Sequence, residues 1–244
     1  MSSRRAIAAQ TRAESLLHLR RGESLLVMLA IPLGVLVFFA KIDSSISDVY
    51  PDPVDFLVPG VLSLAVMATA MVSLGIATGF ERRYGVLKRL GSTPLSRGGL
   101  LAAKTATVLA FECLQIALIV AVGAAIGWNV PSGMLLAVPL LALGTIAFAG
   151  IGLFMAGTLR AEANLAGANA LFLVLLFLGG MAYPLARLPS GLERFAKLLP
   201  AAALSETVRA VLTAAPFPGG ELAVLIVWAV GAPLLAARYF RWEE

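Results

Sequence analysis

The chain has 244 residues, of which 59% are hydrophobic and only 14% are charged, and its mean hydropathy is +0.91. A soluble globular domain carries about 25% charged residues, so this composition excludes that class and predicts an integral membrane protein. The net charge of +5 does not indicate nucleic-acid binding, because the basic residues lie at the ends of apolar runs, where they determine membrane topology.

The first 23 residues contain five arginines. Apolar residues recur between them at helical spacing, which predicts an amphipathic helix over residues 1–23 on the cytosolic membrane surface. Anionic headgroups attract the arginines of such a helix. A solvated tail is the alternative interpretation of the same pattern.

Six apolar segments follow, each with the composition and approximate length of a transmembrane helix. In chain order they cover residues 24–40, 56–80, 105–127, 134–157, 165–183 and 221–237. The sequence therefore predicts an all-α membrane protein in which residues 1–244 form a single transmembrane domain with six transmembrane helices.

Lysine and arginine are distributed unequally between the two sides of these spans. The side that holds the termini has 14 of the 19 basic residues, and the other side has 5. Cytosolic segments carry the excess of basic residues, so both termini are predicted in the cytosol. We expect a multi-pass protein of the cytoplasmic (inner) membrane.

The loop between the second and third spans is strongly basic, and Glu81 is its only acid. The pattern of residues 81–90 predicts a short helix, which Gly91 ends and Pro94 separates from the next span. A charged cytosolic helix with a span on each side is placed to receive a push from a soluble partner and pass it to both spans. We expect residues 81–104 to form this coupling loop.

Residues 184–218 combine five prolines with apolar residues at helical spacing. They are too interrupted and too charged to form a span, and they predict short re-entrant helices in the outer leaflet. The apolar residues of this region are expected to pack against the fifth and sixth spans, and the charged ones to stay in water. The apolar set is Leu192, Phe195, Leu198 and Leu199, and the charged set is Glu193, Arg194 and Lys197.

The sequence carries no motif for catalysis and no spacing typical of metal ligands. Residues 98–105 resemble a phosphate-binding loop, but Ala103 replaces the glycine that lets backbone amides approach a phosphate. Lys104 is therefore interpreted as an anchor at the end of a span. We expect no catalytic, cofactor or metal site on this chain.

Glu112 is the one acid that lies well inside a predicted span. A buried acid in a membrane is costly, and two explanations stay open. Glu112 either pairs structurally with an arginine, with Gln115 or with a neighbouring span, or it serves as the proton relay of a secondary transporter.

Three segments together resemble the permease subunits of type-2 ATP-binding-cassette (ABC-2) exporters. They are F-L-V-P-G at residues 56–60, E-R-R-x-G-x-L-x-x-L-x-x-T-P-L-S at residues 81–96 with Lys104 following, and Y-P-L-x-x-L-P at residues 183–189, continuing through Pro200 to Glu206 and Arg209. Their order and spacing extend over nearly the whole chain. Ala103 departs from the glycine that the family usually has before this lysine.

The resemblance implies two permease subunits, identical or different, above two separate ATPase subunits that bind ATP and Mg²⁺. It implies ATPase coupling through Glu81, Arg82, Arg83, Gly85, Leu87, Lys88 and Leu90. It also implies an extracellular cap that includes Pro184, Leu188, Pro189 and Pro200.

The same resemblance implies a substrate path between subunits, near the first, second and fifth spans. These spans supply apolar residues that include Phe38, Phe39, Phe56, Met67, Met71, Phe172 and Phe177. Such a lining favours a hydrophobic or amphipathic cargo, such as a drug, an antibiotic or a membrane lipid. A polysaccharide or glycolipid exporter is the alternative within the family, and a proton-coupled transporter that uses Glu112 is the alternative outside it.

Overall fold

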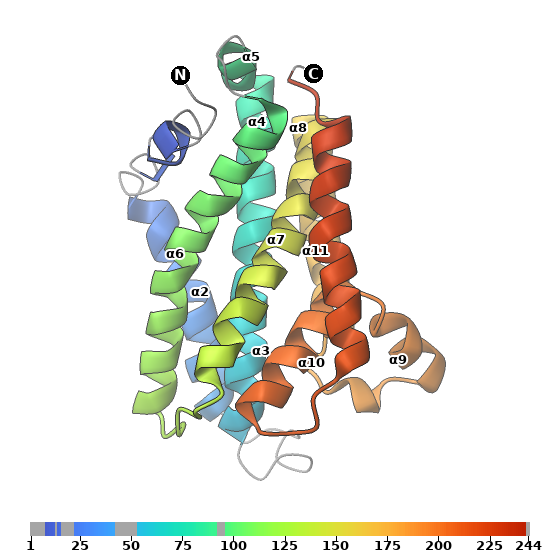
Figure 1. The fold of residues 1–244 in the computed structure, drawn as a ribbon. Coiled ribbons are helices and arrows are strands. Elements are labelled where there is room, and N and C mark those ends of the chain that lie inside the picture. Colours follow the sequence, from blue (N-terminus) through green and yellow to red (C-terminus); the bar gives the residue numbers. More distant parts are fainter. Residues whose placement is uncertain (1–7, 13, 16–21, 42–52, 92–95, 243–244) are drawn as a thin grey trace.

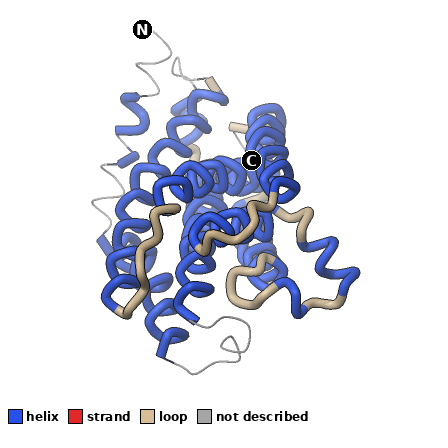
Figure 2. Tube along the Cα trace, turned by 60° about the horizontal axis from the view of Figure 1, so that its bottom comes forward, coloured by secondary structure: helices blue, strands red, loops and turns tan. Residues whose placement is uncertain are grey.

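The structure is a computed structural model, and it describes residues 8–12, 14–15, 22–41, 53–91 and 96–242. Within these residues the chain is a bundle of helices without strands (Figures 1 and 2). Five segments are long and apolar enough to cross a membrane: Pro53–Arg83, Arg97–Ala125, Met134–Thr158, Ala161–Leu178 and Gly219–Tyr239. The predicted all-α membrane protein is confirmed. A sixth span depends on α2 (Gly22–Lys41), in which the apolar stretch Leu29–Lys41 is shorter than the five segments above.

One long helical segment lies at the centre of the bundle. It consists of α3 (Pro53–Met67), the π-helical turn η1 (Ala68–Ser73) and α4 (Leu74–Arg83), which follow one another without a break. The most apolar part of this central rod is 83% buried, against 44% or less in the other four candidate spans. A helix that is apolar on all sides belongs inside a bundle. The rod is packed by α2, α6 (Arg97–Ala125), α7 (Met134–Thr158), α8 (Ala161–Leu178) and α10 (Pro200–Leu212).

Glycines bring α7 into backbone contact with two neighbours. A Cβ atom on Gly152 would lie 2.5 Å from the carbonyl oxygen of Met71 in the central rod. A Cβ atom on Gly150 would lie 2.5 Å from the backbone nitrogen of Pro233 in α11 (Gly219–Tyr239). Small residues at crossings of this kind allow the close packing by which membrane helices associate. The rod, α7 and α11 are therefore held together largely by backbone contact.

Residues 184–218 form short helices, as predicted. The residues expected to pack lie mostly in and just after α9, but the helix that packs is α10. η2 (Leu185–Arg187) and α9 (Ser190–Ala196) are followed by α10, which packs against α3, α7 and α11. Leu192, Phe195 and Leu198 are exposed, contrary to the prediction, whereas Leu199 packs against the core as predicted. Helix α9 projects sideways from the bundle (Figure 1). The small side chains of Ala201, Ala202 and Ala203 let α10 take the buried position instead.

Three segments depart most clearly from the boundaries predicted from the sequence. The helix predicted over residues 81–90 is interrupted, because Gly85 adopts φ +71° between α4 and α5 (Val86–Gly91). Helix α6 begins at Arg97 rather than at 105, since the Ser96 side chain accepts a hydrogen bond from the Gly99 nitrogen and caps it. Helix α8 covers Ala161–Leu178 rather than 165–183, and Gly180, with φ +65°, turns the chain after it.

The backbone contact of α7 with the central rod can be tested with a matched pair of glycine-to-alanine substitutions. Gly152→Ala should lower the melting temperature in detergent, since even a methyl group cannot fit beside the Met71 carbonyl, and overpacking costs about 1–3 kcal/mol. Gly231→Ala is the control, because a Cβ atom there meets nothing within 4 Å and alanine gains the same helix propensity. Equal melting temperatures for the two variants would contradict the close crossing.

Candidate functional site

We call the end of the bundle from which α5 protrudes the α5 end. A glycine turn connects α5 to the central rod there. The turn is closed by hydrogen bonds from the Tyr84 nitrogen to the Phe80 oxygen (2.9 Å) and from the Gly85 nitrogen to the Arg82 oxygen (3.1 Å). A positive φ is readily adopted only by glycine, so Gly85 sets the angle at which α5 leaves the rod. Figure 1 shows α5 beyond the ends of the neighbouring helices.

The short helix α5 has one face against the bundle and one face outside it. Leu87 is completely buried, and Leu90 packs against the core. The outward set, all of them exposed, is Tyr84, Val86, Lys88 and Arg89. An apolar and basic surface of this kind suits a docking partner that offers both apolar and acidic groups.

A buried lysine joins three elements directly below α5. The Lys104 ammonium on α6 lies 2.7 Å from the Glu81 carboxylate at the end of α4 and 3.1 Å from the carboxylate of Glu14. Lys104 is 2% exposed, so both contacts are made with little water around the ammonium. We call these three residues the Lys104 cluster. The prediction of Lys104 as a simple span-end anchor is therefore wrong, because the side chain points into the protein.

Hydroxyl groups attach the N-terminal segment to the same place. The Thr107 hydroxyl contacts the Thr11 carbonyl oxygen at 3.4 Å, and the Thr11 hydroxyl contacts the Ala103 carbonyl oxygen at 3.5 Å. Together with Glu14, these contacts fix residues 8–15, as far as they are described, against the first turns of α6.

Two arginines extend the connection from α4 to α7 and α8. Arg82 is 4% exposed, and its guanidinium donates to the carbonyl oxygen of Leu159, the C-cap of α7, at 2.5 Å. Arg83 forms an ion pair with Glu162 in the first turn of α8. The buried Asn164 side chain adds a 2.8 Å hydrogen bond to the Gly75 carbonyl oxygen.

The residues predicted for coupling include an inward group, Glu81, Arg82 and Leu87, and the exposed residues Arg83 and Lys88. We call the end of α4, the Tyr84–Gly85 turn and α5 the α4–α5 corner. The inward residues hold this corner to the bundle, and Arg83 connects it to α8 through the ion pair with Glu162. The sequence did not reveal the partners Glu14, Glu162 and Asn164, of which Glu162 is exposed, because they are distant along the chain. It also missed Tyr84, Val86 and Arg89 on the outward face, because that face exists only once Gly85 interrupts the helix.

A second polar cluster lies within the membrane-spanning part. Glu112 on α6 is 2% exposed and accepts a hydrogen bond from the Thr145 hydroxyl on α7. One turn along α6, the side-chain amide oxygen (Oε1) of Gln115 accepts a hydrogen bond from the Thr69 hydroxyl at 3.3 Å. Thr69 belongs to the π-helical turn η1, where the extra residue per turn shifts side-chain directions. Of the two explanations left open for Glu112, these contacts favour structural pairing with a neighbouring span.

At the opposite end, Arg209 of α10 connects the re-entrant region to the central rod. Its guanidinium lies 2.5 Å from the Glu206 carboxylate, donates to the Gly180 carbonyl oxygen at 2.6 Å, and sits 4.2 Å above the centre of the Phe56 ring. The four residues predicted for the cap lie in this region: Pro184 and Pro200 are buried, Leu188 is partly buried, and Pro189 is exposed.

The seven residues predicted for a substrate path do not lie on one surface. Phe56, Met67 and Met71 are completely buried inside this chain. Phe38 and Phe39 on α2 and Phe177 on α8 are exposed, and Phe172 is partly buried. Of these seven residues, only those on the exposed faces of α2 and α8 are available to line a path between subunits.

A family model described as ABC-2 type transporter matches residues 5–213. The match covers the Lys104 cluster, the α4–α5 corner, Glu112 and Arg209, and this chain belongs to the ABC-2 type transporter family. The resemblance found in the three sequence segments is confirmed. Proteins of this family are membrane components of transporters and are not themselves catalytic. No curated protein matches the chain.

The Lys104 cluster can be tested by a double-mutant cycle. Lys104→Met should cause a large loss of stability, because breaking a buried ion pair leaves uncompensated carboxylates and costs about 3–5 kcal/mol. Adding Glu81→Gln to Lys104→Met should cause little further loss, although Glu81→Gln alone destabilises. Arg97→Met is the control for an exposed basic residue on the same helix and should leave the melting temperature unchanged. Losses for Lys104 and Glu81 that simply add would contradict the pairing.

Proposed function

We propose that this chain is the permease subunit of an ATP-driven exporter, in which α5 docks onto a separate ATPase and the Lys104 cluster carries the motion of α5 into the bundle. The supporting observation is the α4–α5 corner, where an outward apolar and basic face is attached to a buried ion cluster. Family membership supports the same assignment, because members of this family form the membrane part of ABC transporters.

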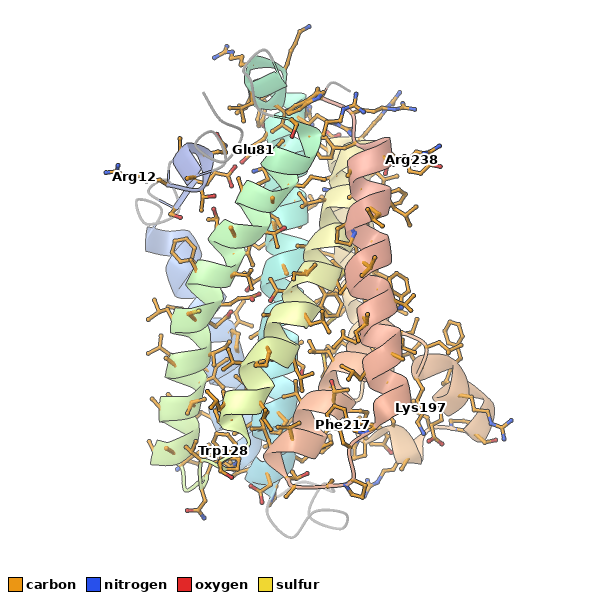
Figure 3. The ribbon with its side chains drawn as sticks, viewed as in Figure 1. Arg12, Glu81, Trp128, Lys197, Phe217 and Arg238 are labelled. Carbon is orange, nitrogen blue, oxygen red and sulfur yellow. The ribbon has the colours of Figure 1, made fainter. Side chains whose placement is uncertain are left out.

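The proposal takes α2 as the sixth span and places both termini in the cytosol. Figure 3 shows Arg12, Glu81 and Arg238 at one end of the bundle and Trp128, Lys197 and Phe217 at the other. Exposed basic residues gather at the first of these ends, and they include Arg12, Arg83, Lys88, Arg89, Arg97, Arg160, Arg238 and Arg241. Basic residues mark the cytosolic side, which supports a cytosolic α5 end in the inner membrane, with α9 and α10 outside.

In the proposed assembly two permease subunits, identical or different, stand above two ATPase subunits. ATP and Mg²⁺ bind to the ATPase pair, and closure of that pair pushes α5. The push enters α4 through the short Gly85 turn. It spreads to the N-terminal segment and α6 through the Lys104 cluster, to α7 through Arg82, and to α8 through Arg83.

The path for cargo is proposed between the two permeases, along the exposed faces of α2 and α8. These faces present Ile31, Phe38 and Phe39 on α2 and Leu173, Val174 and Phe177 on α8. None of these side chains is charged, and an uncharged lining favours a hydrophobic or amphipathic cargo such as a drug, an antibiotic or a lipid.

Coupling is tested by changing the angle of α5. A side chain at Gly85 is strained by its φ of +71°, so Gly85→Leu should misplace α5 while the bundle still inserts. We expect export of a hydrophobic dye to fall at least tenfold in proteoliposomes, and ATP hydrolysis to lose its stimulation by the dye. Gly191→Leu is the control, since Gly191 in α9 has open space around it and no positive φ. Normal dye export by Gly85→Leu would remove the basis of the proposal.

A further inference from the structure

Helices α6 and α7 lie side by side in front of the central rod, and a carboxyl group is buried between them (Figure 1). Glu112 of α6 is 2% exposed, and its Oε2 atom is in hydrogen-bond contact with the Thr145 hydroxyl of α7. Its other oxygen, Oε1, is buried and has no hydrogen-bond partner in the part of the chain that the structure describes. The coupling route proposed above does not use this group.

Among the described residues, no basic side chain lies close to this carboxyl group. On α6 itself, Lys104 precedes Glu112 by eight residues, or about 12 Å along the helix axis, and it is already paired with Glu14 and Glu81. Helix α7 and the π-helical turn η1 contain no charged residue. The other helices that contact α6, which are α2, α3 and α11, carry their charged residues near their ends, at Glu23, Lys41, Asp55, Glu221 and Arg238. A carboxylate at Glu112 would therefore be an uncompensated buried charge, which is the costly case in a membrane.

The hydrogen bonds of Thr145 indicate where a proton is held. Its hydroxyl contacts two groups, the Glu112 carboxyl group and the Leu141 carbonyl oxygen, the latter at 3.0 Å. A hydroxyl has one hydrogen to donate, and a carbonyl oxygen has none. Both contacts contain a hydrogen only if Thr145 donates to Leu141 and Glu112 donates to Thr145. Glu112 is then a carboxylic acid with its proton on Oε2, and Oε1 is an uncharged carbonyl oxygen rather than half of a carboxylate.

The packing beside this pair leaves room for the two helices to part. A groove of about 390 Å³ opens between α6, α7 and α11, and its walls include Leu109 and Ile146. Leu109 lies about one turn before Glu112, and Ile146 directly follows Thr145. Side-chain packing between α6 and α7 is thus incomplete next to the Glu112–Thr145 bond, so this bond has a larger share in holding the helices together.

We propose that Glu112 is a proton-binding site that locks α6 to α7: the carboxylic acid donates a hydrogen bond to Thr145, and loss of its proton to water separates the two helices at this level. The physical reason is that a carboxylate cannot remain in an apolar contact that offers it a single hydroxyl. A proton relay across the membrane needs a second titratable group within reach, and the described residues around Glu112 offer none. The proton therefore acts as a lock and is not passed on.

Infrared spectroscopy tests the proton directly, because the C=O stretch of a carboxylic acid is separate from the bands of a carboxylate. The full chain is purified in detergent as the assembly it forms and is measured at neutral pH. The wild type should show a carboxylic-acid band, and Glu112→Gln should lose it and still fold, since the neutral amide can donate to Thr145 in the same way. Glu221→Gln, which removes a partly buried acid from α11, is the control and should keep the band. Absence of the band from the wild type, or its retention in Glu112→Gln, would overturn the proton site.

The direction of the hydrogen bond has its own pair of variants. Thr145→Val removes the acceptor of the acid hydrogen at nearly constant shape, so the carboxylic-acid band should shift. Thr158→Val is the matched control on α7, because the Thr158 hydroxyl donates within its own helix to the Phe154 carbonyl oxygen at 2.7 Å, and the band should not move. An unchanged band in Thr145→Val would contradict donation from Glu112 to Thr145.

The lock is tested by the distance between two spin labels at neutral and alkaline pH. Cys113, exposed on α6 beside Glu112, carries one label, and Val138→Cys at an exposed position of α7 carries the other. Alkaline pH should lengthen the distance when Glu112 is present, because its proton is removed, and should leave it unchanged in Glu112→Gln, whose amide does not ionise. The same response in both backgrounds would overturn the lock. None of these measurements needs ATP or the ATPase, so their outcome is independent of the coupling test at Gly85.

Discussion

A lysine ammonium cannot be buried in a bundle of this kind without carboxylates beside it. Stripping water from an ion costs several kcal/mol, and only close partners restore that loss. Lys104 meets this requirement with Glu81 from α4 and Glu14 from the N-terminal segment. The start of α6, the end of α4 and residues near the N-terminus are therefore obliged to stay together. The position of α5 depends on this constraint, because only the two residues of the Tyr84–Gly85 turn separate α4 from α5.

The central rod relates the two ends of the molecule. At the α5 end it is held by the Lys104 cluster and by Arg82, in the middle by the Thr69–Gln115 contact at η1, and at the far end by Arg209 above Phe56. Charged or polar contacts hold it at three levels, and backbone contact through Gly152 fixes its distance from α7. A force applied at α5 thus meets a rod whose attachments are specific, in a bundle whose remaining contacts are mostly apolar and non-directional.

Hydropathy predicted the elements that have unambiguous ends. Helices α7 and α11 were expected at 134–157 and 221–237, and they cover Met134–Thr158 and Gly219–Tyr239, because polar or glycine-rich turns bound both. Hydropathy failed to predict the end of α4, because a single backbone angle at Gly85 decides where that helix stops. Gly75, Gly79 and Gly85 follow one another in the same region, and only Gly85 takes a positive φ, which composition cannot distinguish.

The site was harder to predict than the fold, for a different reason. Glu14 lies ninety residues before Lys104 in the chain, and a periodic pattern says nothing about partners at that separation. Glu81 and Arg82 were predicted only as charges of a cytosolic coupling helix, whereas the structure uses both to fasten α4 inward. In the region of residues 184–218, Leu192, Phe195 and Leu198 were expected to pack, yet they are exposed, and the alanine-rich α10 is buried instead.

The central claim is that α5 is the surface that meets the ATPase, and site-specific photo-crosslinking tests it most directly. A photoreactive amino acid is placed at Val86, on the exposed face of α5, and for comparison at Phe217, which is exposed at the other end. Irradiation of the assembled transporter should join the Val86 probe to the ATPase subunit, with a yield that changes when ATP binds, and the Phe217 probe should give no such product. Cross-linking of the ATPase from Phe217 and not from Val86 would contradict the account.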